Sequence, residues 1–90
     1  MKKGQKLETT TTIIEAFEAN VNDHYYGDAY IFEVYIEEIH HIYVLEYSSK
    51  ETAYGIEHKH FDLQSDAVEE FNKVVKSIKQ TVIDELTKSL

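Results

Sequence analysis

Three histidines in the chain have spacing that could hold a metal ion. His58 and His60 lie two residues apart in the segment HKHFD, and His41 lies one strand length upstream. Alternate residues of a β-strand point to the same face, so an H-x-H step presents two imidazoles together. Imidazole nitrogen is a common ligand of zinc and other transition metals. The spacing predicts either a metal site of His41, His58 and His60 or three structural histidines at the edge of a core.

Other patterns that carry chemistry are missing from the sequence. The chain has no cysteine, which excludes disulfides and thiolate nucleophiles and is typical of a cytoplasmic protein. Its three glycines are isolated, so no glycine loop can cradle a phosphate. The adjacent carboxylates Glu37 and Glu38 would point to opposite faces of a strand. We therefore expect no enzyme activity and no cofactor.

The charge of the chain indicates the chemistry of its partner. Ninety residues make one domain, 1–90, with 17 acidic residues against 9 lysines and no arginine. Three lysines fall in the first six positions, and we expect residues 1–11 to form a flexible arm. An acidic body without arginine is a poor ligand for nucleic acid, so a basic protein is the expected partner. No apolar run approaches the length of a membrane span, and no membrane association is expected.

Hydrophobic periodicity predicts the elements that would position these residues. Alternating apolar residues indicate strands over 29–37, 41–48 and 52–61. From Asp66 to about residue 88, apolar residues recur at steps of three and four, as in an amphipathic helix. Residues 12–21 favour a helix by the spacing of their apolar side chains, although their threonines and isoleucines also favour a strand.

These elements predict an α+β fold. It is a three-stranded antiparallel meander with a long C-terminal helix and a short N-terminal helix packed on one face, in the order α-β-β-β-α. If residues 12–21 form a strand, the order becomes β-β-β-β-α. A turn near 37–40 would oppose Val34 to Tyr43. A second turn at 48–51 would oppose Leu45 to Ile56 and His41 to His60, which places the histidines on the core side.

The face of the sheet without helices is the predicted interaction surface. The residues expected to bind a partner there are Glu33, Tyr35, Glu37, Val44, Glu46 and Glu57, with Lys59 on the same face. Carboxylates that border apolar side chains suit a basic partner, whereas an ordinary solvated face is the alternative. The apolar residues of the helix tail, or those of this face, could instead form a homodimer.

The sequence contains no proline and no arginine and is rich in isoleucine, glutamate and lysine. In composition and size it resembles the small acidic inhibitors encoded by phages and mobile elements, which include anti-CRISPR and anti-restriction proteins. The resemblance implies a protein that occupies a basic, nucleic-acid-binding site of a host defence nuclease as a nucleic-acid mimic. The alternatives are a histidine-based metal- or ligand-binding module, a homodimeric structural or accessory protein, and an immunity protein.

Overall fold

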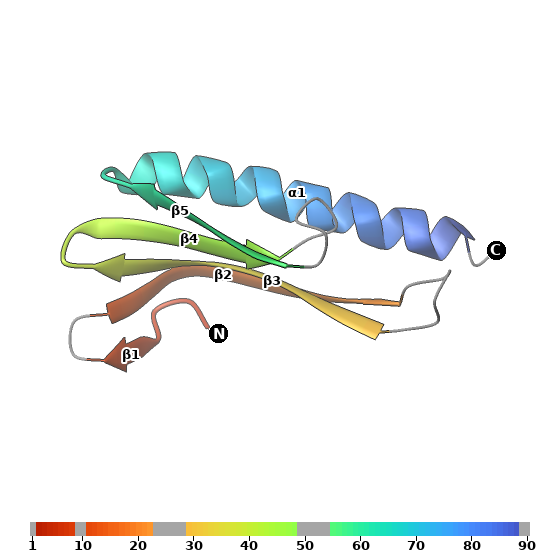
Figure 1. Ribbon diagram of the computed structural model, residues 1–90, viewed down its shortest axis with the longest axis horizontal. Helices are drawn as coiled ribbons and strands as arrows, with labels where there is room; N and C mark the ends of the chain where they lie inside the picture. Colours follow the sequence, from red (N-terminus) through yellow and green to blue (C-terminus); the bar gives the residue numbers. More distant parts are fainter. Residues whose placement is uncertain (1, 9–10, 23–28, 49–54, 89–90) are drawn as a thin grey trace.

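The computed structural model describes residues 2–8, 11–22, 29–48 and 55–88. It has an α+β fold in which one antiparallel sheet is covered on one face by a C-terminal helix (Figure 1). The sheet has the order β1-β2-β3-β4-β5, so each strand pairs with its neighbours in the sequence. The elements are β1 (Lys6–Glu8), β2 (Thr11–Asn22), β3 (Ala29–Ile39), β4 (Ile42–Ser48), β5 (Ile56–Phe61) and α1 (Gln64–Lys88).

The predicted N-terminal helix over 12–21 is wrong, because these residues form β2. β2 pairs with β3 from Thr11 opposite Ile39 to Asn22 opposite Ala29. A β-bulge between Ile13 and Glu15 inserts one extra residue and interrupts the alternation of apolar side chains. That interruption produced the helix-like spacing. The alternative order β-β-β-β-α therefore describes the four longer strands.

The segment expected to be a flexible arm contributes the short strand β1. It pairs antiparallel with the start of β2. Two backbone hydrogen bonds support this pairing: the Ile13 amide donates to the Gln5 carbonyl at 2.7 Å, and the Gly4 amide donates to the Ile13 carbonyl at 2.5 Å. Lys3 adds an ion pair to Glu15 at 2.8 Å. At least part of residues 1–11 is thus tied to the sheet.

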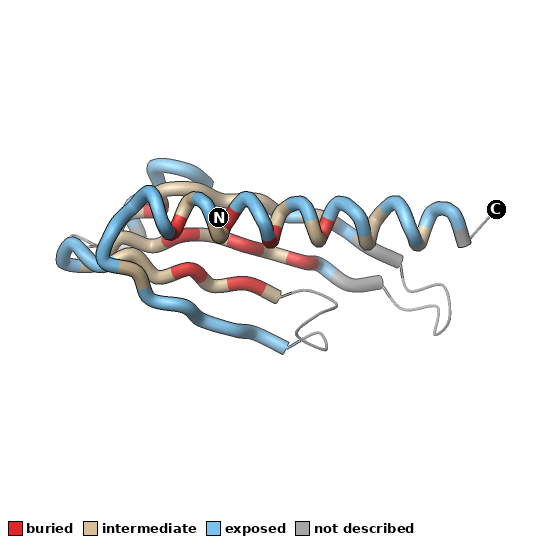
Figure 2. Tube along the Cα trace, turned by 90° about the horizontal axis from the view of Figure 1, so that it is seen from above, coloured by how far each residue is buried: buried red, intermediate tan, exposed pale blue. Residues whose placement is uncertain are grey.

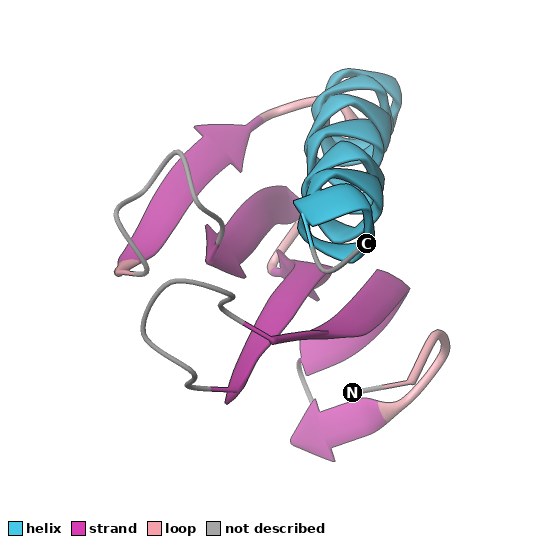
Figure 3. Ribbon diagram, turned by 90° about the vertical axis from the view of Figure 1, so that its right-hand side faces the viewer, coloured by secondary structure: helices cyan, strands magenta, loops and turns pink. Residues whose placement is uncertain are grey.

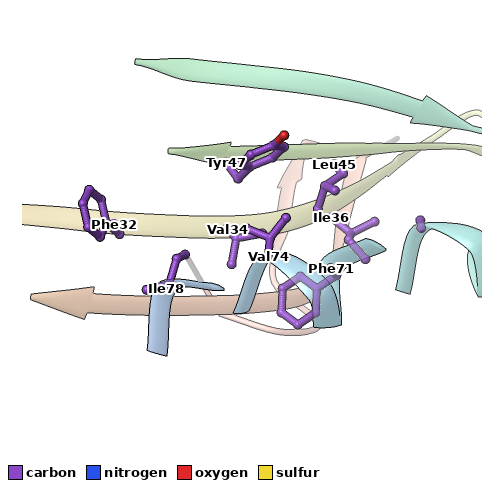
Figure 4. Packing of buried hydrophobic residues seen from close by; sticks show 9 residues of the cluster. Phe32, Val34, Ile36, Leu45, Tyr47, Phe71, Val74 and Ile78 are labelled. Atoms are coloured by element: carbon purple, nitrogen blue, oxygen red, sulfur yellow. The ribbon is translucent and has the colours of Figure 1, made fainter. Parts of the chain in front are cut away.

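The hydrophobic core lies between α1 and the middle strands of the sheet, as the buried segments of Figure 2 show. Apolar residues of β3 and β4 point toward the helix, as their alternation predicted (Figure 4). On α1 the buried residues follow steps of three and four. The cluster consists of Phe32, Val34, Ile36, Leu45, Tyr47, Ala67, Phe71, Val74 and Ile78.

The hairpin between β3 and β4 turns through only two residues, His40 and His41. Ile39 lies opposite Ile42, and both histidines have positive φ angles, 50° and 66°. Positive φ at both central residues defines a type I′ turn, whose twist matches the twist of paired strands. The predicted turn near 37–40 is therefore wrong by a few residues. Val34 lies opposite Tyr47, four residues from the predicted partner Tyr43. Because four is an even number, every side chain stays on its predicted face of the sheet.

The register between β4 and β5 differs from the prediction by an odd number of residues. Leu45 lies opposite Lys59, three residues beyond the predicted partner Ile56. An odd displacement reverses the faces of a strand. Glu57 and Lys59 therefore face the helix side of the sheet, whereas His58 lies on the opposite side. This reversal is the main correction to the predicted architecture.

Helix α1 begins at Gln64, two residues before the predicted start. The Ala67 amide donates to the Leu63 carbonyl at 3.3 Å, which makes Leu63 the N-cap residue. Asp66 lies in the first turn, where its carboxylate favours the helix dipole, rather than in the cap. No helix in the described part of the chain has the length and apolar character needed to cross a bilayer.

Candidate functional site

The face of the sheet opposite α1, here called the outer face, carries five of the six residues predicted to bind a partner. Figure 3 shows the helix on the other side of the strands. The five alternate along β3 and β4 with residues of the core, and the register places Tyr35 opposite Glu46 and Glu37 opposite Val44. Glu33 continues the row on β3. The alternation of side chains along β3 and β4 was therefore sufficient to predict that these five residues share a face.

Glu57, the sixth predicted residue, is not on the outer face. It lies opposite Tyr47, and the Tyr47 hydroxyl donates to Glu57 Oε2 at 2.8 Å. Burial and this hydrogen bond together raise the pKa of Tyr47. The neighbouring Lys59 donates to Glu70 of α1 at 3.0 Å and lies 5.7 Å from the centre of the Tyr47 ring. Glu57 and Lys59 thus form a polar border on the helix side of the sheet edge.

Glu46 lies at the centre of a polar cluster on the outer face. The Tyr35 hydroxyl donates to Glu46 Oε2, and His58 Nε2 lies 3.5 Å from Glu46 Oε1. Burial, followed by the hydrogen bond and the negative charge of Glu46, raises the pKa of Tyr35. Burial, followed by the charge of Glu46, also raises the pKa of Glu37. Burial is thus the larger cause of both shifts, and the negative charge of Glu46 adds to it.

A hollow of about 460 Å³ opens beside this cluster and extends toward β2 and β5. Glu18 of β2 lies directly opposite Glu33, so two like charges are cross-strand neighbours, an arrangement that destabilises a sheet. The hollow also has an apolar border, because Ile31 and Ile56 are 61% and 65% exposed. Its lining residues are Glu18, Ile31, Glu33, Tyr35, Glu46, Tyr47, Ser48 and Ile56.

Sequence reasoning missed Glu18 and Ile56 as members of this surface. Glu18 was assigned to a helix, and its place opposite Glu33 follows only from the pairing of β2 with β3. Ile56 was assigned to the core side and moved to the outer face with the reversal of β5. The strand-favouring composition of residues 12–21 was the one signal that could have located Glu18.

The structure does not bring together the three histidines proposed to bind metal. His41 lies in the exposed β3–β4 turn, so the predicted pairing of His41 with His60 is wrong. His60 lies opposite Val44 on the outer face, and His58 lies beside Glu46. Among the described residues, no group of three His, Asp or Glu side chains is placed to hold a metal ion.

The outer face of the sheet is acidic. On strands β2 to β5 the outer face carries Glu18, Glu33, Glu37 and Glu46 and no lysine. Among the described residues, lysines are found in the N-terminal segment 2–6, on α1 beside acidic residues, and at the helix side of β5. Comparison of the chain with protein-family models, curated proteins and solved structures gives no match. The outer face itself is therefore the basis for a functional assignment.

Proposed function

We propose that this chain is a non-enzymatic acidic binding protein whose outer face occupies a basic site of a partner protein. One observation carries the proposal. Three glutamates, Glu18, Glu33 and Glu46, line a hollow on the sheet face that lies opposite α1, and the exposed Ile31 and Ile56 border it. Glu37 adds a fourth carboxylate to the same face. The partner that fits this surface is a protein with a nucleic-acid-binding site, such as a host defence nuclease.

The spacing of the carboxylates supports a resemblance to nucleic acid. Glu46 lies opposite Tyr35, so it is the diagonal cross-strand neighbour of both Glu33 and Glu37. Diagonal neighbours in an antiparallel sheet are roughly 7–8 Å apart. Repeated negative charge at this spacing attracts the lysine and arginine side chains that normally contact phosphates. Complementary charge of this kind raises the association rate and makes binding sensitive to salt.

The apolar residues on the same face supply the part of binding that salt does not weaken. Ile31, Ile42 and Ile56 are 61%, 44% and 65% exposed, and the register places all three side chains on the outer face. Protein interfaces bury apolar side chains together with polar and charged ones. The proposed partner surface therefore has basic residues with apolar residues beside them.

The experiment is a capture of partners from a lysate of the source cell, followed by affinity measurements with the purified partner at low and high salt. Glu18→Lys and Glu33→Lys should each weaken binding by roughly tenfold or more. The matched control is Glu69→Lys on α1, which makes the same charge change at a side chain that is 71% exposed. Equal affinities for the outer-face variants and the control would remove this face as the binding surface.

A further inference from the structure

The strand β5 forms an open edge of the sheet. In the described part of the chain it pairs with β4 alone, and its residues from Ile56 to His60 are exposed. An open edge presents unpaired amide and carbonyl groups to any other strand. We propose that β5 pairs antiparallel with β5 of a second copy, which joins two sheets into one; this inference is independent of the proposed function.

The charge of β5 distinguishes it from the other long strands. β2, β3 and β4 carry glutamates and no lysine, and each is paired on both sides. The other edge strand, β1, also carries one lysine and one glutamate but has only three residues. β5 carries one glutamate, Glu57, and one lysine, Lys59. Both point to the same side of the sheet, because they are two residues apart. A second β5 can therefore approach with opposite charges in contact.

The possible registers of such a pair are few. Residues that are directly opposite in a sheet must share a face, so the pairing must be centred on a residue. Only the registers centred on His58 and on Lys59 pair five residues of this six-residue strand. Centring on Lys59 would place two lysines opposite each other. Centring on His58 places Glu57 opposite the second copy's Lys59 twice, related by the two-fold axis.

Lys59 also explains why the edge would accept its own copy and reject other strands. A charged residue at a sheet edge normally prevents pairing, because an apolar neighbour would bury the charge without a partner. In the register centred on His58, the same lysine meets Glu57 of the second copy. Each group already has an intramolecular hydrogen bond: Lys59 donates to Glu70, and Glu57 accepts from Tyr47. An ammonium has three donors and a carboxylate has several acceptor sites, so both have capacity for a second partner.

The experiment measures the mass of the full chain in solution by sedimentation equilibrium over a range of concentrations. Wild-type protein should approach twice the 10.5 kDa of one chain as concentration rises. Glu57→Lys and Lys59→Glu should each remain monomeric at concentrations where the wild type is a dimer. An equimolar mixture of the two variants should recover the dimer mass, because each lysine pair then meets a glutamate pair. Glu69→Lys, on α1, is the control that should leave the dimer unchanged.

Hydrogen exchange of the wild-type chain gives a second readout that needs no variant. Alternate amides of β5 should become protected as concentration rises, whereas amides at the β1 edge should not. A wild-type chain that stays monomeric throughout would overturn the proposal, as would a dimer that both single variants leave intact. A mixture of folded variants that stays monomeric would overturn the register centred on His58. Protection that is absent from β5 while a dimer forms would place the interface elsewhere.

Discussion

The two-residue turn at His40 and His41 makes a direct prediction for stability. Type I′ turns require positive φ at both central positions, and asparagine followed by glycine is the preferred pair there. Both histidines have positive φ, 50° and 66°, and both are exposed. The double substitution His40→Asn and His41→Gly should therefore stabilise the protein, because it removes backbone strain without removing a buried contact.

The expected size of the gain follows from the backbone conformation. A residue with a side chain costs about 1–2 kcal/mol in the left-handed region, and asparagine relieves part of this cost at position 40. Glycine relieves it fully at position 41, but its greater freedom in the unfolded chain takes back about 0.5–1 kcal/mol. The net increase in the free energy of unfolding should be about 0.5–1.5 kcal/mol. For a domain of this size, that corresponds to a rise in Tm of roughly 3–10 °C.

The assay is thermal and denaturant unfolding followed by circular dichroism. The matched control is the double substitution His40→Ala and His41→Ala, which removes both imidazoles but keeps a Cβ atom at each position. The alanine variant should show no gain, since alanine is strained at positive φ. If the asparagine–glycine variant were no more stable than the alanine variant, the left-handed two-residue turn and the β3–β4 register that depends on it would both be refuted.

Three further predictions concern the core, the outer face and the start of α1. Ile78→Ala should lower the free energy of unfolding by about 2–5 kcal/mol in denaturant titrations, because Ile78 is fully buried. The control Ile83→Ala should lower it by less than about 0.5 kcal/mol, because Ile83 is 55% exposed. Burial and the charge of Glu46 raise the pKa of Glu37, so the folded state holds the Glu37 proton more tightly than the unfolded chain does. The folded state therefore loses stability as pH rises above the ordinary pKa of 4.5. Glu37→Gln should thus raise Tm relative to wild type at neutral pH and lose this advantage below about pH 4; an advantage that persists there would contradict the assignment. Leu63→Ser should stabilise the protein by about 0.5–1 kcal/mol in thermal unfolding, because serine accepts a hydrogen bond at an N-cap and leucine cannot; a loss of stability would show that Leu63 has a packing role instead.

The sequence was sufficient to predict the core faces of β3, β4 and α1. In β3 and β4 the core face is apolar along most of each strand, and the register error was an even four residues, so every side chain stayed on its predicted face. The helix was equally clear, because buried residues such as Phe71 and Ile78 recur at helical spacing. Strong local patterns of this kind determine which side of an element is buried.

The faces of β5 and the conformation of residues 12–21 were not determined by local pattern. β5 is an edge strand with polar residues on both faces, so burial does not select its register and the prediction was reversed. In β2 the bulge between Ile13 and Glu15 breaks the alternation that marks a strand. The pairing of β2 with β3 along its length decides its structure, and such long-range pairing cannot be found from propensity alone.

The reversal of β5 removes a lysine from the outer face. It also places Glu57 and Lys59 together at the sheet edge, where they could pair with a second copy of the chain. The predicted face held four glutamates and Lys59; the reversal removes Glu57 and Lys59 from it, and the pairing of β2 with β3 separately adds Glu18. The same change places Glu57 and Lys59 together on the helix side, at the border of the sheet. A register with the opposite parity would have added a cation to the acidic face and placed Glu57 and Lys59 at the edge of that face. The single odd displacement therefore separates a surface suited to a basic partner from an edge suited to a second copy of the chain.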